Sequence, residues 1–190
     1  YGADIKLPGM IFGAVLRSPH AHAKIINIDT SKAENMNGVF AVMTAKDLPR
    51  LTDKQRGNSE ESGSEKHLSE NVMALDKVLY KGHVVAAVSA KDINTAREAV
   101  KKIIVDYKVL KPVINVDQAM EKGAPILHED FIGDHLGKKV KKTNIATYNR
   151  YKIGNADDAF KKCDLIVEKE VELQTVHQGY IEPHSGTAIW

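Results

Sequence analysis

The residues best equipped for chemistry lie together near the carboxyl end of the chain. The segment His177–His184 (HQGYIEPH) places a carboxylate, an amide and two imidazoles close together. Such groups can exchange protons with a substrate or bind a metal ion. We single out Gln178 and Glu182 as candidate site residues. For Glu182, a buried structural carboxylate is the simpler interpretation.

Histidine and cysteine residues elsewhere are weaker candidates. His20 and His22 are two apart, so on a strand they would face the same side and could share a metal ion, but no third ligand is near in sequence. Cys163 has no neighbouring base, which favours a structural thiol. Gly82-His83 lacks the repeated glycines of a phosphate-binding loop. We therefore expect no catalytic, cofactor-binding or metal-ligating residue in this chain.

Strands and helices are expected to alternate over the first two thirds of the chain. Short apolar or alternating runs predict strands at 11–16, 23–28, 39–44, 84–89 and 104–109. Tyr80 is expected to join the sheet ahead of a turn at Gly82. Asp92 caps the clearest helix, whose apolar face continues at helical spacing to Ile104.

Shorter helical turns are predicted from capping patterns. Ser31 with Glu34 has the spacing of a capping box, and Thr44 with Asp47 caps another short turn. A further short helix is expected over 116–120, ending near Gly123.

Two segments stand apart by composition. Residues 52–70 carry almost no large apolar side chain, so we expect a mobile loop. Residues 138–152 contain six basic and no acidic residues. A solvated linker is the simpler interpretation of this run, and a docking surface for a partner subunit is the alternative. Beyond it, Asn155 is expected to cap a helix to Lys162, followed by strands at 165–167 and 171–175.

Length and composition suit a piece of a larger protein. The chain has 190 residues, 43% of them hydrophobic, and a net charge of +2. That length predicts one domain, or one with an incomplete second. The small charge gives no reason to expect nucleic-acid or membrane binding. A single cysteine excludes an internal disulfide and fits a reducing compartment, so a cytoplasmic location is expected. There is no apolar run long enough for a membrane span and no signal-peptide pattern.

Five segments, in order along the chain, resemble one enzyme family. They are Leu7–Ile25, Val39–Pro49, Val78–Val88, Ala124–Asp130 and Tyr180–His184. Together they resemble the large, molybdenum-binding subunit of the xanthine dehydrogenase and aldehyde oxidase family.

The resemblance implies an α/β (α+β) fold in two parts. An α/β-hammerhead domain with a mixed sheet and short helices is expected over 1–137, and a basic linker over 138–152. Residues 153–190 would be the truncated start of the molybdopterin-binding domain. The chain begins at Tyr1 without methionine and ends at Trp190 in what reads as a strand, so we expect a piece of a longer subunit.

The same resemblance implies a function for the intact enzyme. It would hydroxylate a purine, another N-heterocycle or an aldehyde with oxygen from water, and pass electrons through 2Fe–2S clusters to FAD. The full-length subunit would hold molybdopterin or molybdopterin cytosine dinucleotide. Expected partners are the rest of that subunit and the FAD-binding and iron–sulfur subunits or domains, in an oligomer. The family's catalytic glutamate and glycine-rich cofactor segments lie further on, so this chain is expected to be structural and inactive alone.

By this resemblance, Gln178 and Glu182 lie at the entry of the cofactor domain, behind the residues that touch the cofactor. Two alternatives from other classes stay open. One is a non-catalytic α/β binding or subunit-assembly module. The other is nucleic-acid binding through residues 138–152, where Tyr148 and Tyr151 are the only aromatic residues that could stack on bases.

Overall fold

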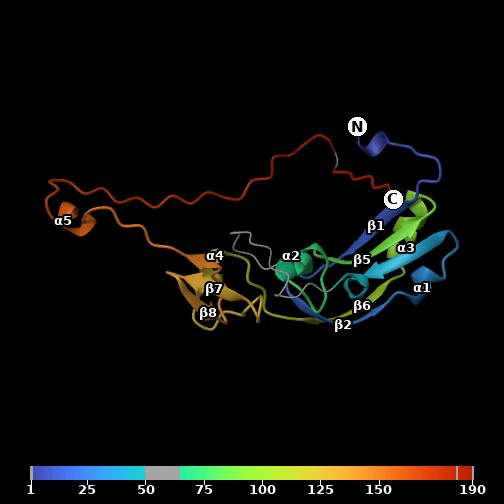
Figure 1. Cartoon of the computed structure of the whole chain (residues 1–190), viewed down its shortest axis with the longest axis horizontal. Helices are drawn as coiled ribbons and strands as arrows, with labels where there is room; N and C mark the ends of the chain where they lie inside the picture. Colours follow the sequence, from blue (N-terminus) through green and yellow to red (C-terminus); the bar gives the residue numbers. More distant parts are fainter. Residues whose placement is uncertain (1, 50–64, 183, 190) are drawn as a thin grey trace. The chain divides into compact units, whose positions relative to one another are not determined.

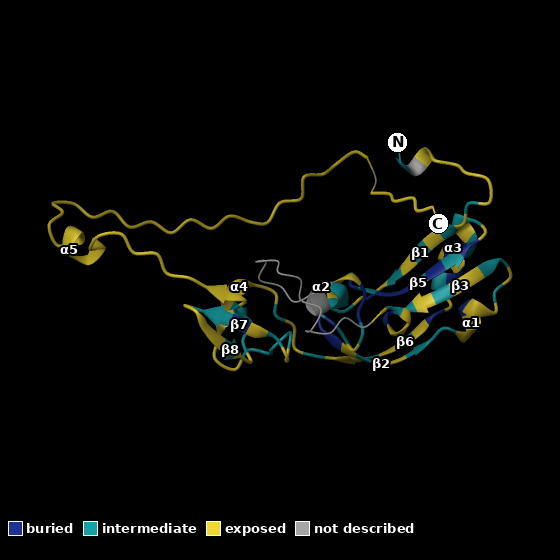
Figure 2. Ribbon diagram, in the orientation of Figure 1, coloured by how far each residue is buried: buried dark blue, intermediate teal, exposed yellow. Residues whose placement is uncertain are grey.

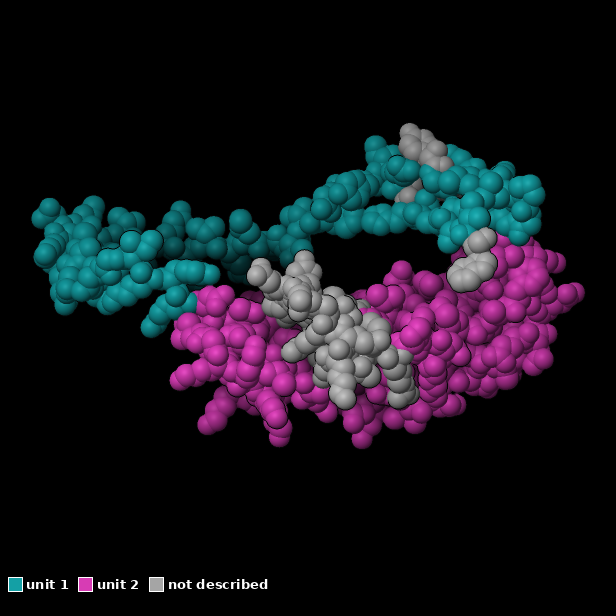
Figure 3. Space-filling model, in the orientation of Figure 1, with its two compact units in different colours: residues 1–10, 150–190 teal, residues 11–149 magenta. Residues whose placement is uncertain are grey.

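The computed structural model describes residues 2–49, 65–182 and 184–189. They divide into two compact units (Figure 3). Residues 11–149 form one unit, and the described parts of 1–10 and 150–190 form the other. The unit of residues 11–149 holds all of the strands and most of the helices (Figure 1).

The first sheet is built around a strand of small and β-branched residues. In spatial order it consists of β1 (Phe12–Arg17), β5 (Val84–Ala90) and β3 (Val39–Thr44), with both pairings antiparallel. Ala86 and Val88 of β5 are buried in one cluster with Ala33 and Ala99. Ala33 belongs to α1 (Ser31–Glu34) and Ala99 to α3 (Ile93–Val100), so these two helices cover this face of the sheet. In Figure 2 the dark blue of buried residues follows β5.

The second sheet contacts the first sheet through Val85 of β5. In spatial order it consists of β4 (Lys77–Val78), β2 (Ala23–Asp29) and β6 (Ile104–Val109), again antiparallel. Ala23 and Val78 are fully buried against Val85 of β5. Ile28 and Val105 pack against this cluster and also against the cluster under the helices. The two sheets therefore share one continuous core.

A third small sheet occupies part of the expected basic linker. In spatial order it consists of β8 (Lys138–Lys141), β7 (Ile132–His135) and β9 (Thr147–Tyr148). β7 pairs antiparallel with β8 and parallel with β9. The prediction of a simple linker over 138–152 is therefore wrong for 138–141 and 147–148. The lysines of β8 are solvated as expected, but the backbone between them forms a hairpin ladder with β7.

The capping predictions have mixed outcomes. Asp92 caps α3 by accepting from Thr95 N at 2.7 Å, and Thr44 and Asp47 form a capping box at the 3-10 turn η2 (Ala45–Asp47). The predicted box at Ser31 is wrong: Asp29 Oδ1 instead accepts from the backbone and hydroxyl of Ser31, at 3.0 and 2.6 Å. α3 ends at Val100, and Ile104 belongs to β6 rather than to the helix.

Two further helices follow the predicted pattern. Asn115 caps α4 (Val116–Met120), and the chain turns at Gly123 with a left-handed φ of 84°. Gly82 makes the expected turn before β5 with a φ of 90°, but Tyr80 lies in the connection after β4 rather than in a strand. In the described ranges no helix combines the length and apolar character needed to cross a bilayer.

Part of the expected mobile loop is helical. α2 (Glu65–Val72) covers the end of the predicted loop 52–70, so that prediction is wrong from residue 65 onward. The remainder of the loop, 52–64, lies outside the described residues. The sequence of the predicted loop does not show this helix, because the residues that fix its carboxyl end lie beyond residue 70. These are Met73 and Ala74, which are buried in the core.

The unit formed by the described parts of 1–10 and 150–190 contains α5 (Ala156–Phe160), which Asn155 caps as predicted, and the 3-10 turn η1 (Gly2–Asp4). The strands predicted at 165–167 and 171–175 are wrong: both segments are exposed and unpaired among the described residues. An extended segment becomes a strand only when a neighbour completes its hydrogen bonds, and the described residues offer none.

Candidate functional site

The predicted polar cluster lies on an exposed, extended segment. His177 Nδ1 accepts from Gly179 N at 2.9 Å, and the ring of Tyr180 lies 6.3 and 6.2 Å from the rings of His177 and His184. Glu182 Oε1 accepts from Gly2 N at 3.3 Å. Both Glu182 and Gln178 are exposed, so the expectation of a buried Glu182 is wrong in this structure. The described segment offers polar groups but does not enclose them.

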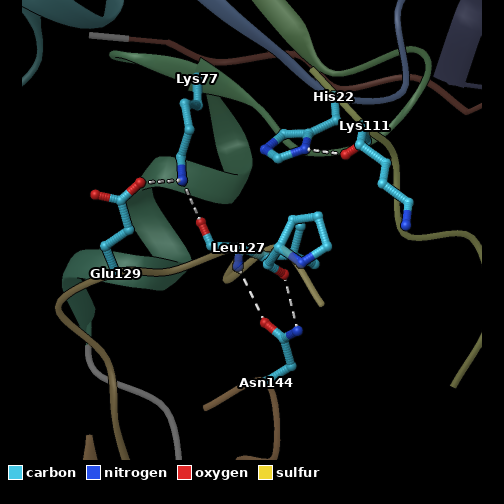
Figure 4. Close-up of polar contacts among 7 residues, drawn as sticks. His22, Lys77, Lys111, Leu127, Glu129 and Asn144 are labelled. Carbon is cyan, nitrogen blue, oxygen red and sulfur yellow. Dashed lines mark hydrogen bonds and ion pairs between the residues drawn. The ribbon is translucent and has the colours of Figure 1, made fainter. Parts of the chain in front are cut away.

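His20 and His22 serve different contacts. His22 is buried, and its Nδ1 donates to Lys111 O at 2.7 Å, as Figure 4 shows. Its Nε2 is buried without a hydrogen-bond partner. The His20 ring instead meets the Tyr107 ring edge-on at 5.0 Å. Within the described ranges, no three His, Cys, Asp or Glu side chains converge as metal ligands would.

His83 is a buried titratable residue that sequence reasoning missed. Its Nδ1 accepts from Leu79 N at 3.2 Å, so the neutral ring carries its proton on Nε2 and donates to Glu70 O at 2.9 Å. The ring also stacks on Tyr80, with centroids 4.3 Å apart. Burial lowers the pKa of His83. This side chain therefore fixes the last turn of α2 against the loop before β5.

Two more missed residues hold the segment between the second and third sheets (Figure 4). Lys77 Nζ donates to Leu127 O at 2.7 Å and approaches Glu129 Oε1 at 3.3 Å. Asn144 accepts from Leu127 N at 3.0 Å and donates to the carbonyls of Pro125 and Ala119 at 2.9 and 3.1 Å. The sequence gives no local signal for these bonds, because each joins residues far apart in the chain.

The Lys77–Glu129 pair also lines an open pocket of about 470 Å³. Lys24, Glu70 and Asp76 contribute further charges of both signs to its wall.

Cys163 is not part of this pocket. It is exposed just after α5, where its thiol contacts Ala159 O at 3.3 Å. The contacts of His83, Lys77 and Asn144 anchor the segments that connect helices and strands. They do not pair a nucleophile with a base among the described side chains.

Two family descriptions match the chain in succession. Residues 1–111 match the aldehyde oxidase and xanthine dehydrogenase a/b hammerhead domain. Residues 137–190 match the molybdopterin cofactor-binding domain. The third sheet and the exposed polar segment therefore fall in or next to the second match.

Named relatives agree with these matches. The chain is 37% identical over 185 residues to the carbon monoxide dehydrogenase large chain of Afipia carboxidovorans, covering 96% of this chain and 22% of that protein. It is 32% identical over 189 residues to a probable xanthine dehydrogenase subunit from Bacillus subtilis, covering 100% of this chain and 23% of that protein. The chain thus spans about a fifth of the length of these relatives.

A solved structure supports the same assignment. Reconstituted CO dehydrogenase from Oligotropha carboxidovorans is similar with a TM-score of 0.66 and 38% identity, over 87% of this chain and 20% of that one. The sequence identity, the order of the two matched domains and the fold all point to the same family. The chain belongs to the aldehyde oxidase and xanthine dehydrogenase family, and it carries the hammerhead domain followed by the start of the molybdopterin cofactor-binding domain.

Proposed function

We propose that this chain is the hammerhead region, with the adjoining start of the cofactor domain, of a large subunit in a molybdenum-dependent oxidoreductase. The observation that carries the proposal is the succession of two matched domains in one chain, in the order in which the relatives have them. The reaction class proposed is oxidation of a small substrate with oxygen from water. Electrons would leave through iron–sulfur and FAD-binding domains or subunits.

The relatives' names span several substrates of that reaction class. They include carbon monoxide, xanthine, nicotinate, hypoxanthine and aldehydes. We propose a substrate from this set, with purines, N-heterocycles and aldehydes as the classes that the sequence resemblance favours. The single cysteine supports a reducing compartment such as the cytoplasm.

The described residues do not by themselves fit a molybdopterin. Residues 150–182 and 184–189 are exposed, and their polar groups face no enclosed cradle. The cofactor, when bound in such an enzyme, supplies the redox chemistry. The proposed role of this chain is to support that site. His83, Lys77 and Asn144 fix the connections within the unit of residues 11–149, and Gln178 with Glu182 would stand at the entry to the cofactor domain.

The test is an isotope experiment on the native protein that contains this sequence. The purified enzyme is incubated in water enriched in oxygen-18 with each candidate substrate and an artificial electron acceptor. The proposal expects one substrate to yield a product that carries oxygen from water. Incorporation from dioxygen instead, or no oxidation of any of these substrates, would contradict it.

A further inference from the structure

Unusual backbone geometry is concentrated in the hairpin of residues 132–142, hereafter the β7–β8 hairpin. Among the described residues, only Leu136 and Lys142 are non-glycine residues with a left-handed φ, both at 53°. They flank β8, one at each end. Side chains with a Cβ rarely adopt this conformation, and such strain tends to persist where function requires it.

The surrounding structure holds Leu136 in this conformation. His135 pairs with Lys138, which leaves Leu136 and Gly137 as a two-residue turn with φ values of 53° and 79°. Turns of this kind favour asparagine or glycine rather than leucine. Leu136 N donates to Tyr148 O at 2.8 Å, and Gly137 N donates to Asp134 Oδ1 at 2.9 Å. Hydrogen bonds to β9 and to β7 therefore hold the turn in this conformation within the chain itself.

The side chain at this turn gains little from its position. Leu136 is 53% exposed, and Ile132 at the other end of β7 is 42% exposed. A strained leucine that remains exposed stabilises the isolated chain less than the asparagine that such a turn prefers. An apolar side chain on a hairpin tip whose backbone is already held rigid instead loses little conformational entropy when it enters a pocket on another protein.

Basic side chains surround this tip. Lys138, Lys139, Lys141 and Lys142 are all exposed, and no acidic residue occurs between 138 and 152. Of these four lysines, only Lys139 has an ion-pair partner among the described residues, Asp134 at 2.9 Å. That pairing lowers the pKa of Asp134 and neutralises the only carboxylate of the hairpin. The remaining lysines leave a net positive rim around an apolar tip.

We propose that the β7–β8 hairpin docks another protein subunit of the same enzyme, one that presents an apolar depression rimmed by carboxylates. This inference rests on the proposed function, which supplies a multi-subunit assembly. The exposed leucine favours a protein over a nucleic acid, because it adds nothing to phosphate binding. Lysines on an edge strand can also serve only to prevent aggregation, and the variants below separate that role from docking.

The first measurement is zero-length cross-linking of the native assembled enzyme with a carbodiimide, which joins a lysine amine to a carboxylate in contact with it. The expected result is a cross-link from Lys138, Lys141 or Lys142 to an aspartate or glutamate of a different subunit. Cross-links only within this polypeptide or to a second copy of it would overturn the proposal. So would a preparation with one kind of polypeptide, or protection of these lysines by added nucleic acid. The molybdenum content of the same preparation tests the proposed function separately.

The second measurement uses variants in the full-length subunit. Leu136→Asn relieves strain at the turn and is expected to leave the full-length subunit folded, yet to weaken subunit association at least tenfold. Lys141→Glu with Lys142→Glu keeps the edge charged against aggregation but is expected to weaken association at least tenfold. The matched control, Lys32→Glu with Lys46→Glu, changes two exposed lysines outside the hairpin and should leave association unchanged. Unchanged association in both hairpin variants would overturn the proposal.

Discussion

At the scale of single residues, the buried histidine His83 is the clearest stabilising side chain of the unit of residues 11–149. Both ring nitrogens are hydrogen bonded, one as acceptor and one as donor, so only the neutral ring satisfies both partners. Protonation would turn the Nδ1 acceptor into a second donor facing Leu79 N. The buried side chain therefore links the stability of this region to pH.

The pH dependence of unfolding should expose this link. Burial lowers the pKa of His83, so the unfolded chain binds the proton more readily and stability falls as the pH drops below about 6.5. His83→Gln should cost about 1–2 kcal/mol at pH 7 but show a flatter decline from pH 7 to 5. Thermal unfolding across this range measures both. His177→Gln, on an exposed histidine, should reproduce the wild-type slope, and equal slopes in all three proteins would contradict the role of His83.

Asn144 makes a second residue-scale prediction. Its amide satisfies one donor and two acceptors on the segment 119–127. Asn144→Ala leaves these partly buried backbone groups without partners and should lower the free energy of unfolding by about 1–3 kcal/mol. Denaturant unfolding measures the loss. Asn94→Ala, on an exposed helical asparagine, is the control and should have little effect; equal losses in the two variants would show that the Asn144 bonds are not stabilising.

At the scale of elements, the third sheet depends on a close backbone approach at Gly133. A Cβ at this position would lie 2.4 Å from Ile145 O, which real contacts do not allow. Gly133→Ala should therefore break the pairing of β7 with β9 and speed amide hydrogen exchange in residues 132–148. The control, Gly186→Ala, adds the same methyl group where no atom lies within 4 Å. Unchanged exchange in the Gly133 variant would mean that the sheet accommodates the methyl group.

Elements with local signals could be predicted from the sequence. The strands of the two larger sheets follow apolar runs, and the cap of α3 is visible as Asp92 before an amphipathic stretch. The third sheet was missed because β8 reads as a run of lysines, and what makes it a strand is pairing with β7. The strands predicted after residue 164 are wrong for the opposite reason. Their alternating apolar residues are typical of a strand, but no described segment pairs with them.

The candidate site was predictable only in part. The family and the order of its domains could be identified from five short segments, and the comparisons confirm both. The side chains that fix the structure, His83, Lys77 and Asn144, could not be predicted. Lys77 and Asn144 bond to groups 17 to 52 residues away. His83 bonds to Leu79 nearby and to Glu70, thirteen residues away, and nothing in the sequence around Gly82 predicts that the ring is buried between them. The roles of Gln178 and Glu182 stay a prediction.

At the scale of the whole molecule, the position of the boundary between units can be tested by truncation. A cut near residue 138, which composition alone suggests, would remove β8 and β9 from β7. The unit boundary at residue 149 keeps all three strands together. We expect residues 11–149 to give a folded monomer and residues 11–137 to be less stable, as measured by thermal unfolding and light scattering. Equal melting temperatures would contradict the role of the third sheet.

The exposed carboxyl-terminal segment makes a further prediction for the whole chain. Leu165, Val167, Leu173 and Ile181 are 79 to 101% exposed, and exposed apolar side chains promote association. The 190-residue chain should therefore self-associate with increasing concentration, whereas residues 11–149 should remain monomeric. Light scattering over a concentration series measures this. A concentration-independent monomer for the whole chain would contradict it.

The central claim is that this chain is part of a molybdenum-dependent large subunit, and elemental analysis tests it most directly. The native protein that contains this sequence is purified with the rest of its polypeptide and assayed for molybdenum alongside the 190-residue chain alone. The claim predicts stoichiometric molybdenum in the native protein and none in the 190-residue chain, whose described polar groups do not enclose a cofactor. A native protein without molybdenum, or stoichiometric metal in the isolated chain, would contradict it.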